Sequence, residues 1–293
     1  MIKLSKYLHI PVLLENIINT LDIRKNCVYI DATFGSGGYT KAILDTNKTR
    51  VIAFDQDINA KFYYKLLDFS IKKRCIFYHK NFSEIDIVNK NINKIMGIVF
   101  DLGISSVQLT QYDRGFSFLI DGKLDMRMNL NKKITAYDVI NKMSQKQLAN
   151  ILSLYGGEKK SKKISESISN YRKKYLIYST IQLVKIIKKI VNYNKIHPAT
   201  KVFQAIRIFI NNELNLLKIA LLKAIKIVAI GGIICVVSFH SLEDKIAKLV
   251  FSKYLINKSF TKHSKKTIRP SNKEIQLNPR SRSAKLRSIK KLY

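Results

Sequence analysis

The first hundred residues alternate between short β-rich runs and segments with helical apolar spacing, and this alternation constrains the fold more than any other feature. Three of the four runs end in an aspartate. In a parallel sheet wrapped by helices, ligands bind outside the carboxyl ends of the strands. We therefore expect a binding site where these aspartates gather. The predicted strands are Cys27–Asp31, Arg50–Asp55, Cys75–His79 and Met96–Asp101.

The alternation stops after the fourth run. Residues 105–198 contain several helical patterns and no convincing strand, which predicts an inserted all-helical lobe. The α/β pattern then resumes with a long helix over about 200–228 and a strand at Ile233–Phe239. The fold class is thus α/β, with a tail from about 257 that we expect to be extended or poorly ordered. The expected domains are 1–104 with 199–293, and 105–198 as the inserted lobe.

Composition describes a globular protein with a large positive charge. Hydrophobic residues make up 46% of the 293 residues and charged residues 25%, which excludes general disorder. The net charge is +33. Residues 141–200 hold 13 basic and 2 acidic side chains, and residues 253–293 hold 13 and 1. A compositional bias toward lysine would spread evenly, so this clustering favours a nucleic-acid partner.

Other sequence features exclude several classes of protein. No apolar run is long enough to span a membrane, and no secretory signal is visible, so we expect a cytoplasmic protein. The cysteines Cys27, Cys75 and Cys235 are far apart and are expected to be buried thiols. No histidine or cysteine cluster has metal-ligand spacing, so we expect no metal. The sequence does not indicate an oligomeric state.

A glycine-rich stretch, DATFGSGGY from Asp31 to Tyr39, follows the first predicted strand. Glycines at such a turn let backbone amides approach a negative group at a helix N-terminus, although a purely structural glycine turn is the alternative. Thr40 stands where a dinucleotide fingerprint needs glycine, which disfavours a nicotinamide-dependent oxidoreductase. Asp55, about twenty residues later, could accept hydrogen bonds from both ribose hydroxyls of an adenosine. Asp57 is expected to be a solvated loop acid.

The fourth strand is followed by a stretch of small and polar residues, DLGISSVQ from Asp101 to Gln108. Small residues leave room for a flat base, while carboxylate and hydroxyl oxygens can accept hydrogen bonds from an amine. The catalytic candidates are therefore Asp101, Ser105 and Ser106, and no discrete general base is named. The structural alternative is that either serine only caps the next helix.

Four further residues are candidate substrate contacts, and two of them have a structural alternative. Arg127 lies in an acid and arginine pair that suits RNA contact or an internal salt bridge. His197 lies at the end of the predicted helical lobe, and Arg207 lies on the helix that follows it. His240 follows the last predicted strand, where a hydrogen-bonded structural histidine is the simpler interpretation.

Together these segments resemble the ribosomal RNA small subunit methyltransferase H family. The resemblance covers nearly the whole chain, and several of its motifs are long and unusual. It implies a Rossmann-like methyltransferase domain with an inserted substrate-binding lobe. The matching stretches are His9–Leu14, Asp31–Gly38, Asp101–Gln108, Arg114–Phe118, Leu124–Met128, His197–Arg207, Ser238–Asp244 and Asn278–Ser283.

The resemblance also implies an activity. It implies that S-adenosyl-L-methionine donates a methyl group to the N4 amine of a cytosine in the decoding region of 16S rRNA. Basic residues of the lobe and tail would contact RNA phosphates. The family's cofactor contacts, carried over by position, fall on Gly37, Gly38, Tyr39, Asp55, Phe82, Asp101 and Gln108.

The sequence departs from the family at three positions near these contacts. Ser36 and Tyr39 stand where the family usually has arginine and histidine, and Val107 replaces a proline. These changes keep two other functions in view. One is an RNA-binding protein of the same fold with reduced or lost catalysis, and the other is a methyltransferase acting on another RNA or on DNA.

Overall fold

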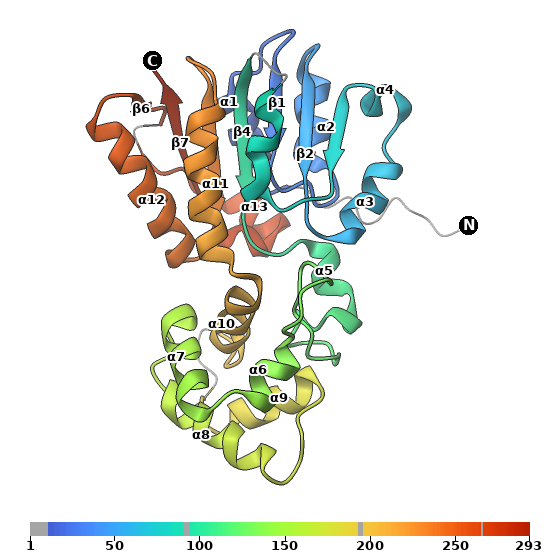
Figure 1. Ribbon diagram of the computed structural model, residues 1–293, viewed down its shortest axis with the longest axis vertical. Coiled ribbons are helices and arrows are strands. Elements are labelled where there is room, and N and C mark those ends of the chain that lie inside the picture. The colour runs from blue at the N-terminus through green and yellow to red at the C-terminus, as the bar shows by residue number, and fades with distance from the viewer. Residues whose placement is uncertain (1–10, 91–93, 193–195, 265) are drawn as a thin grey trace. The chain divides into compact units, whose positions relative to one another are not determined.

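The computed structural model describes residues 11–90, 94–192, 196–264 and 266–293 (Figure 1). His9 and Ile10, the first two residues of the stretch His9–Leu14 that resembles the family, lie outside the described residues. The chain forms two compact units. The first, which we call the sheet unit, runs to Gly103 and resumes at Leu214; the second, the helical unit, is Ile104–Glu213. The helical unit thus extends beyond the expected end of the lobe at residue 198.

The sheet unit is built on a seven-stranded sheet of order β3-β2-β1-β4-β5-β7-β6. β1 to β5 are parallel, and β7 pairs antiparallel with β5 and β6. From β1 the chain adds β2 and β3 on one side of the sheet, and it then returns to place β4 on the other side of β1. The boundary between β1 and β4 is the switch point at which nucleotide-binding α/β folds hold their ligands. The five predicted strands are confirmed to within a residue at each end. The strands are β1 (Val28–Asp31), β2 (Arg50–Phe54), β3 (Cys75–Tyr78), β4 (Ile95–Asp101), β5 (Ile233–Ser238), β6 (Phe260–Lys262) and β7 (Lys285–Lys291).

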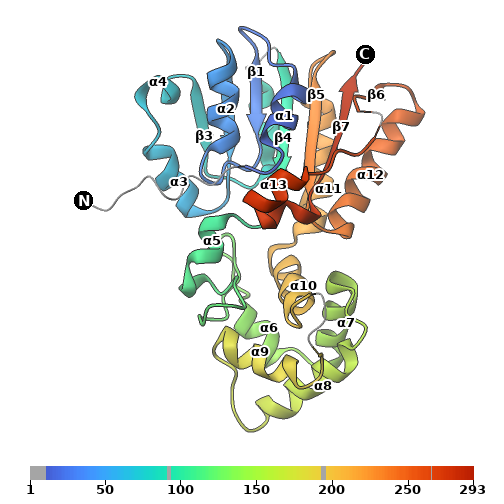
Figure 2. The same cartoon turned by 180° about the vertical axis from the view of Figure 1, so that it is seen from behind.

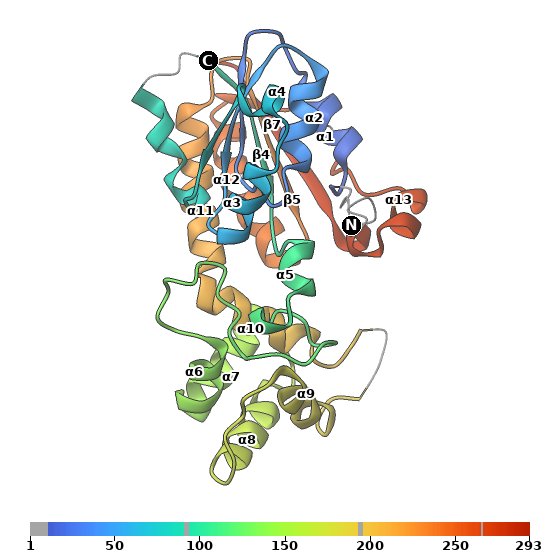
Figure 3. The same cartoon turned by 90° about the vertical axis from the view of Figure 1, so that its right-hand side faces the viewer.

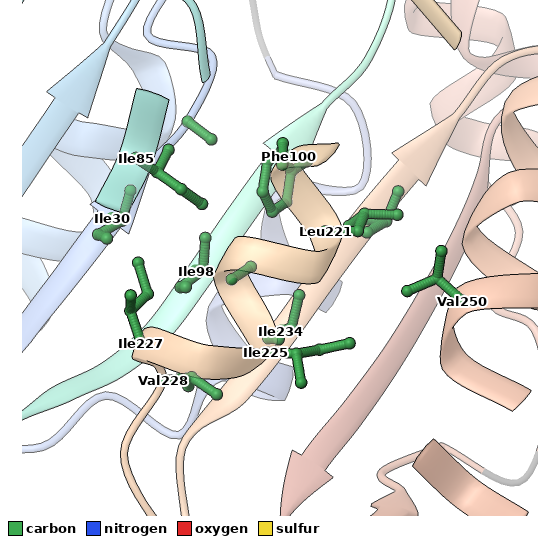
Figure 4. Close-up of a cluster of buried hydrophobic side chains, with 14 of the residues drawn as sticks. Ile30, Ile85, Ile98, Phe100, Leu221, Ile225, Ile227, Val228, Ile234 and Val250 are labelled. Atoms are coloured by element: carbon green, nitrogen blue, oxygen red, sulfur yellow. The ribbon is translucent and has the colours of Figure 1, made fainter. Parts of the chain in front are cut away.

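Helices cover both faces of this sheet (Figure 3). Ile98 and Ile234 point to one face, where they pack with Leu221 of α11 (Figure 4). Val99 and Cys235 point to the other face, against α1 and α2. Strands buried on both faces explain the continuous apolar runs of the sequence. The helices of this unit are α1 (Leu14–Leu21), α2 (Gly38–Thr46), α3 (Ile58–Lys65), α4 (Phe69–Lys72), η2 (Phe82–Lys90), α11 (Glu213–Ile227), α12 (Ser241–Ile256), α13 (Asn272–Leu277) and η4 (Pro279–Ser283).

The expectation of an extended or poorly ordered tail is wrong. The tail supplies α13, η4, β6 and β7, and it completes the sheet beside β5. Leu286 and Ile289 of β7 are buried in the core. Asp244 pairs with Lys285 at 3.2 Å and with Arg287 at 2.6 Å, so part of the basic charge of β7 is neutralised by α12.

The helical unit has its own apolar core, in which α10 packs with α7. The prediction of one continuous helix over 200–228 is wrong, because the structure has two helices there, α10 and α11. Asn212 adopts a left-handed backbone, with φ of 53°, and separates α10 from α11. Asparagine tolerates this conformation better than most residues. The helices of the unit are α5 (Ser106–Thr110), η3 (Tyr112–Arg114), α6 (Ala136–Lys142), α7 (Gln145–Gly156), α8 (Ser161–Arg172), α9 (Thr180–Lys188) and α10 (Thr200–Asn211).

Among the described residues, no helix combines the length and the apolar character that crossing a bilayer requires.

Candidate functional site

Asp31 closes the glycine-rich loop between β1 and α2. Its side chain is fully buried. Oδ2 accepts hydrogen bonds from Thr40 Oγ1 at 2.7 Å and from the Thr40 amide at 3.2 Å, and Oδ1 accepts from the Thr33 amide at 3.2 Å. Burial raises the pKa of Asp31 to about 6, against the effect of these three hydrogen bonds. The sequence did not predict these hydrogen bonds between Asp31 and Thr40. There, Thr40 was only evidence against a dinucleotide-binding fingerprint.

Two glycines shape the turn into α2. Gly37 is the N-cap residue and has a φ of 87°, which favours glycine. A Cβ on Gly38 would lie 2.3 Å from Pro11 Cγ, so only glycine fits there without displacing the chain. Gly37 has no side chain with which to cap the helix. The first amides of α2, those of Gly38 and Tyr39, therefore suit a negatively charged ligand group.

Gly37→Ala is expected to lower the free energy of unfolding by about 2–4 kcal/mol, because it adds overpacking to left-handed strain. The new Cβ would lie 2.9 Å from the Phe34 ring. Gly231→Ala is the matched control, since Gly231 has a φ of 78° and its nearest neighbour would be 3.9 Å away. We expect that control to lose only about 1–2 kcal/mol. Urea unfolding followed by circular dichroism measures both, and equal losses would contradict the role given to Phe34.

The side chain of Tyr39 belongs to the core. It is 3% exposed, and its hydroxyl donates a hydrogen bond to the carbonyl oxygen of Val12, in the segment that leads into α1. The contact that Tyr39 can still offer a ligand is its backbone amide. The tyrosine thus ties the glycine-rich loop to the start of α1.

Asp55 follows β2 and faces the same loop. Oδ2 accepts a hydrogen bond from the Gly35 amide at 2.8 Å, and Oδ1 accepts one from the Asp57 amide at 2.8 Å. Each oxygen retains a second lone pair for a ligand hydroxyl. Burial raises the pKa of Asp55 to about 6. Asp57 is not the solvated acid expected: it is 4% exposed and accepts a hydrogen bond from the Asn59 amide at the start of α3.

Phe82 begins η2, shortly after β3 ends. Its ring packs edge-on against Phe100 of β4, with the ring centroids 6.0 Å apart. The side chain is only partly buried, so part of its apolar surface is open to contact. It offers an apolar surface at the edge where the parallel strands end.

Asp101 ends β4, and its amide donates a hydrogen bond to Thr33 Oγ1 at 2.8 Å. Within the described part of the chain, its buried Oδ1 meets no hydrogen-bond donor. Burial raises the pKa of Asp101 well above its ordinary value, and the charges of Asp31 and Glu243 raise it further. A buried acceptor without a donor is costly unless a ligand supplies one.

The remaining catalytic candidates belong to the helical unit. Ser105 caps α5: its Oγ accepts a hydrogen bond from the Gln108 amide, while Gln108 Oε1 accepts one from the Ser105 amide at 3.0 Å. The structural alternative considered for Ser105 is therefore present. The side chain of Ser106 lies outside the described part. Roles for Ser105, Ser106 and Gln108 at a ligand stay predictions.

The proposed substrate contacts all have partners within the protein. Arg127 pairs with Asp125 at 2.7 Å, and Arg207 pairs with Glu213 at 2.9 Å, so internal salt bridges are present at both arginines. The His197 ring stacks on Phe118, with the centroids 4.6 Å apart. The remaining candidate, His240, caps α12 and accepts a hydrogen bond from the Glu243 amide. RNA contacts by these four side chains stay predictions.

The chain is similar to known proteins along nearly its whole length. The family model described as the MraW methylase family matches residues 6–292. The chain is 44% identical over 297 residues to ribosomal RNA small subunit methyltransferase H of Ehrlichia canis (strain Jake), covering 97% of this chain and 100% of the relative. It is 43% identical over 291 residues to the protein of that name from Wolbachia pipientis subsp. Culex pipiens (strain wPip), covering 97% and 99%. The chain therefore belongs to the MraW methylase family.

Proposed function

We propose that the protein transfers a methyl group from S-adenosyl-L-methionine to the N4 amine of one cytosine in the decoding region of 16S rRNA. Membership of a methylase family, and relatives named as ribosomal RNA small subunit methyltransferases, support the general activity. The single observation that carries the site is Asp101 Oδ1, a buried oxygen that meets no donor among the described residues, at the end of β4 and beside the glycine-rich loop.

The residues of the sheet unit fit this cofactor. The amides of Gly38 and Tyr39 suit its carboxylate, and Gly37 permits the close turn that presents them. Asp55 suits the two ribose hydroxyls, since both of its oxygens can accept another hydrogen bond. Phe82 would pack near the adenine ring. The cofactor supplies an electrophilic methyl group on a sulfonium, which is a good leaving group.

Asp101 would act on the attacking amine. The lone pair of an exocyclic cytosine amine is delocalised into the ring, so the nitrogen is a poor nucleophile. An oxygen that accepts a hydrogen of this amine favours its pyramidal form and turns the lone pair toward the methyl carbon. With the cofactor bound, the amine nitrogen would bond to the methyl carbon as the carbon–sulfur bond breaks and S-adenosyl-L-homocysteine leaves, and the amine would lose one proton to water. Its raised pKa makes the Asp101 carboxylate a stronger acceptor than an exposed aspartate.

The clustered basic residues support an RNA substrate. The helical unit contains the segment 158–189, in which ten basic residues outnumber two acidic ones. Such charge supplies phosphate contacts that do not depend on base sequence. The target base would have to be unstacked before it could reach Asp101.

The activity is tested with labelled S-adenosyl-L-methionine and unmodified small ribosomal subunits, followed by nucleoside analysis of the rRNA. We expect N4-methylcytosine at a single decoding-region site. Binding of the cofactor without transfer to the subunit would overturn the substrate, and competition with other RNA and DNA would then identify the true one. RNA binding without cofactor binding would overturn catalysis and favour an RNA-binding protein of the same fold.

A further inference from the structure

The tail contains a short turn, η4, that holds two exposed arginines on either side of a buried serine. Ser281 is fully buried, and its Oγ donates a hydrogen bond to the Asn278 carbonyl oxygen at 2.7 Å. The amide of Ala284 donates to the Ser281 carbonyl oxygen at 2.7 Å. Arg280 and Arg282 are both exposed on this fixed backbone, and Arg280 also interacts within the protein. The turn therefore holds two exposed arginines on a preorganised support.

Strand register places this turn at the edge of the sheet that carries Asp101. Asp101 lies opposite Val237 of β5, and Val237 lies opposite Leu286 of β7. With strands about 4.8 Å apart, the Cα atoms of Asp101 and Leu286 are roughly 10 Å apart. Because η4 immediately precedes β7, Arg282 lies just beyond that edge. Figure 2 shows α13, which leads into η4, at this same end of the sheet.

The tail is also tied to the loop that is proposed to hold the cofactor. Glu274 of α13 accepts a hydrogen bond from the Leu13 amide at 2.7 Å, beside the Val12 carbonyl that Tyr39 contacts. Leu286 packs in the same apolar cluster as Tyr39. The arginine turn and the glycine-rich loop therefore belong to one packed assembly within the sheet unit.

The charge around this turn suits a phosphate. Residues 253–293 hold thirteen basic side chains and one acidic side chain, Glu274, which accepts a hydrogen bond from the amide of Leu13, just before α1. Lys285 and Arg287 pair with Asp244, so their charges are partly balanced within the protein. A guanidinium group can bind phosphate oxygens through two parallel hydrogen bonds.

We propose that Arg280 and Arg282 bind RNA phosphates next to the nucleotide being methylated, and so set the register of the strand that enters the site. This inference rests on the proposed function. Phosphate contacts of this kind fix the position of a nucleic acid without reading its sequence. The two arginines are positioning residues, and they leave the methyl-transfer step itself to the groups beside the cofactor.

The test compares Arg280→Ala/Arg282→Ala with Lys25→Ala/Arg50→Ala, a double variant with the same loss of charge. Lys25 and Arg50 are exposed at the opposite edge of the sheet, before β1 and at the start of β2. Methyl transfer to unmodified small ribosomal subunits is measured over a salt series. For the tail variant we expect KM for the subunit to rise about tenfold per arginine, with cofactor affinity unchanged. Its log–log salt slope should fall by roughly 1.4–1.8, as for two phosphate contacts.

The outcomes separate this inference from the proposed function. If the wild-type protein methylates nothing, the proposed function fails and this inference with it. If the wild type is active and the two double variants behave alike, only the arginine turn is overturned. Loss of cofactor affinity in the tail variant would also overturn it, because the turn would then be structural. Arg280→Lys/Arg282→Lys should keep the salt slope and recover part of the KM, since charge remains and bidentate geometry is lost.

Discussion

Asp101→Asn is expected to lower the rate of methyl transfer at saturating cofactor and RNA by about 100-fold, while the protein stays folded. The amide has the size of the carboxyl group, but it carries hydrogens of its own and accepts hydrogen bonds more weakly. Asp101 lies near the carboxylates of Asp31 and Glu243, whose charges raise its pKa. Because the substitution removes one of three neighbouring carboxyl groups, the melting temperature of the variant should equal or exceed that of the wild type. A slow but stable variant therefore separates a chemical role from a structural one.

Single-turnover kinetics measure this effect, and titration with S-adenosyl-L-methionine shows whether cofactor affinity changes too. Asp45→Asn is the control, because Asp45 is an exposed aspartate on α2. The rate should also fall as the pH falls, since a protonated Asp101 accepts the amine hydrogen more weakly than the carboxylate does. Because burial raises its pKa, this decline should begin above the usual carboxyl range and vanish in the variant. Full turnover by Asp101→Asn would remove Asp101 from the mechanism.

The part of the site that could be predicted from sequence is the part that strand order determines. Parallel strands buried on both faces appear as continuous apolar runs, and their carboxyl ends meet at one edge. Strand order alone therefore predicts that Asp31, Asp55 and Asp101 lie at the same edge. The glycine-rich loop was equally visible, because a positive φ and a close approach both select glycine at fixed spacing.

Features that depend on contacts between distant residues were not predictable in this way. β7 alternates lysines and arginines with a few apolar residues, and it becomes a strand because β5 offers an edge and Asp244 balances two of its cations. The break at Asn212 depends on a single left-handed residue inside an otherwise helical pattern. In both cases the local sequence is compatible with more than one structure, and tertiary packing selects one.

Side-chain partners were the least predictable feature. The same serine can cap a helix or meet a substrate, and Ser105 is found in a capping box with Gln108. Asp31 looked like one more acid at a strand end, yet it holds the loop closed through Thr40. Residue type and spacing limit what a side chain can do, whereas its role depends on which donors the fold brings within reach.

Asp55→Asn is expected to weaken binding of S-adenosyl-L-methionine by about 10- to 100-fold at pH 8, because hydrogen bonds to a carboxylate are stronger than those to an amide. The wild-type affinity should also depend on pH. The pKa of Asp55 is about 6, so affinity should be constant above that pH and fall about tenfold per pH unit below it. In the variant this dependence should disappear. Calorimetric titration from pH 5 to pH 8 measures both effects, with Asp45→Asn as the control.

The stability of the unliganded protein gives an independent check, because its pH dependence has the opposite sign. A carboxyl whose pKa is raised by folding binds its proton more tightly in the folded state. Lowering the pH through 6 should therefore make the contribution of Asp55 to the stability of the unliganded protein more favourable while it weakens cofactor binding. Comparison of the wild type with Asp55→Asn separates this contribution from the opposite one of His197 and His263, whose pKa values burial lowers. Asp31 has a pKa of about 6 as well, so Asp55→Asn should remove only part of this gain in stability. A pH-dependent affinity that survives in Asp55→Asn would assign the titration to Asp31 or Asp101, whose pKa values burial also raises, and would contradict the titration proposed for Asp55.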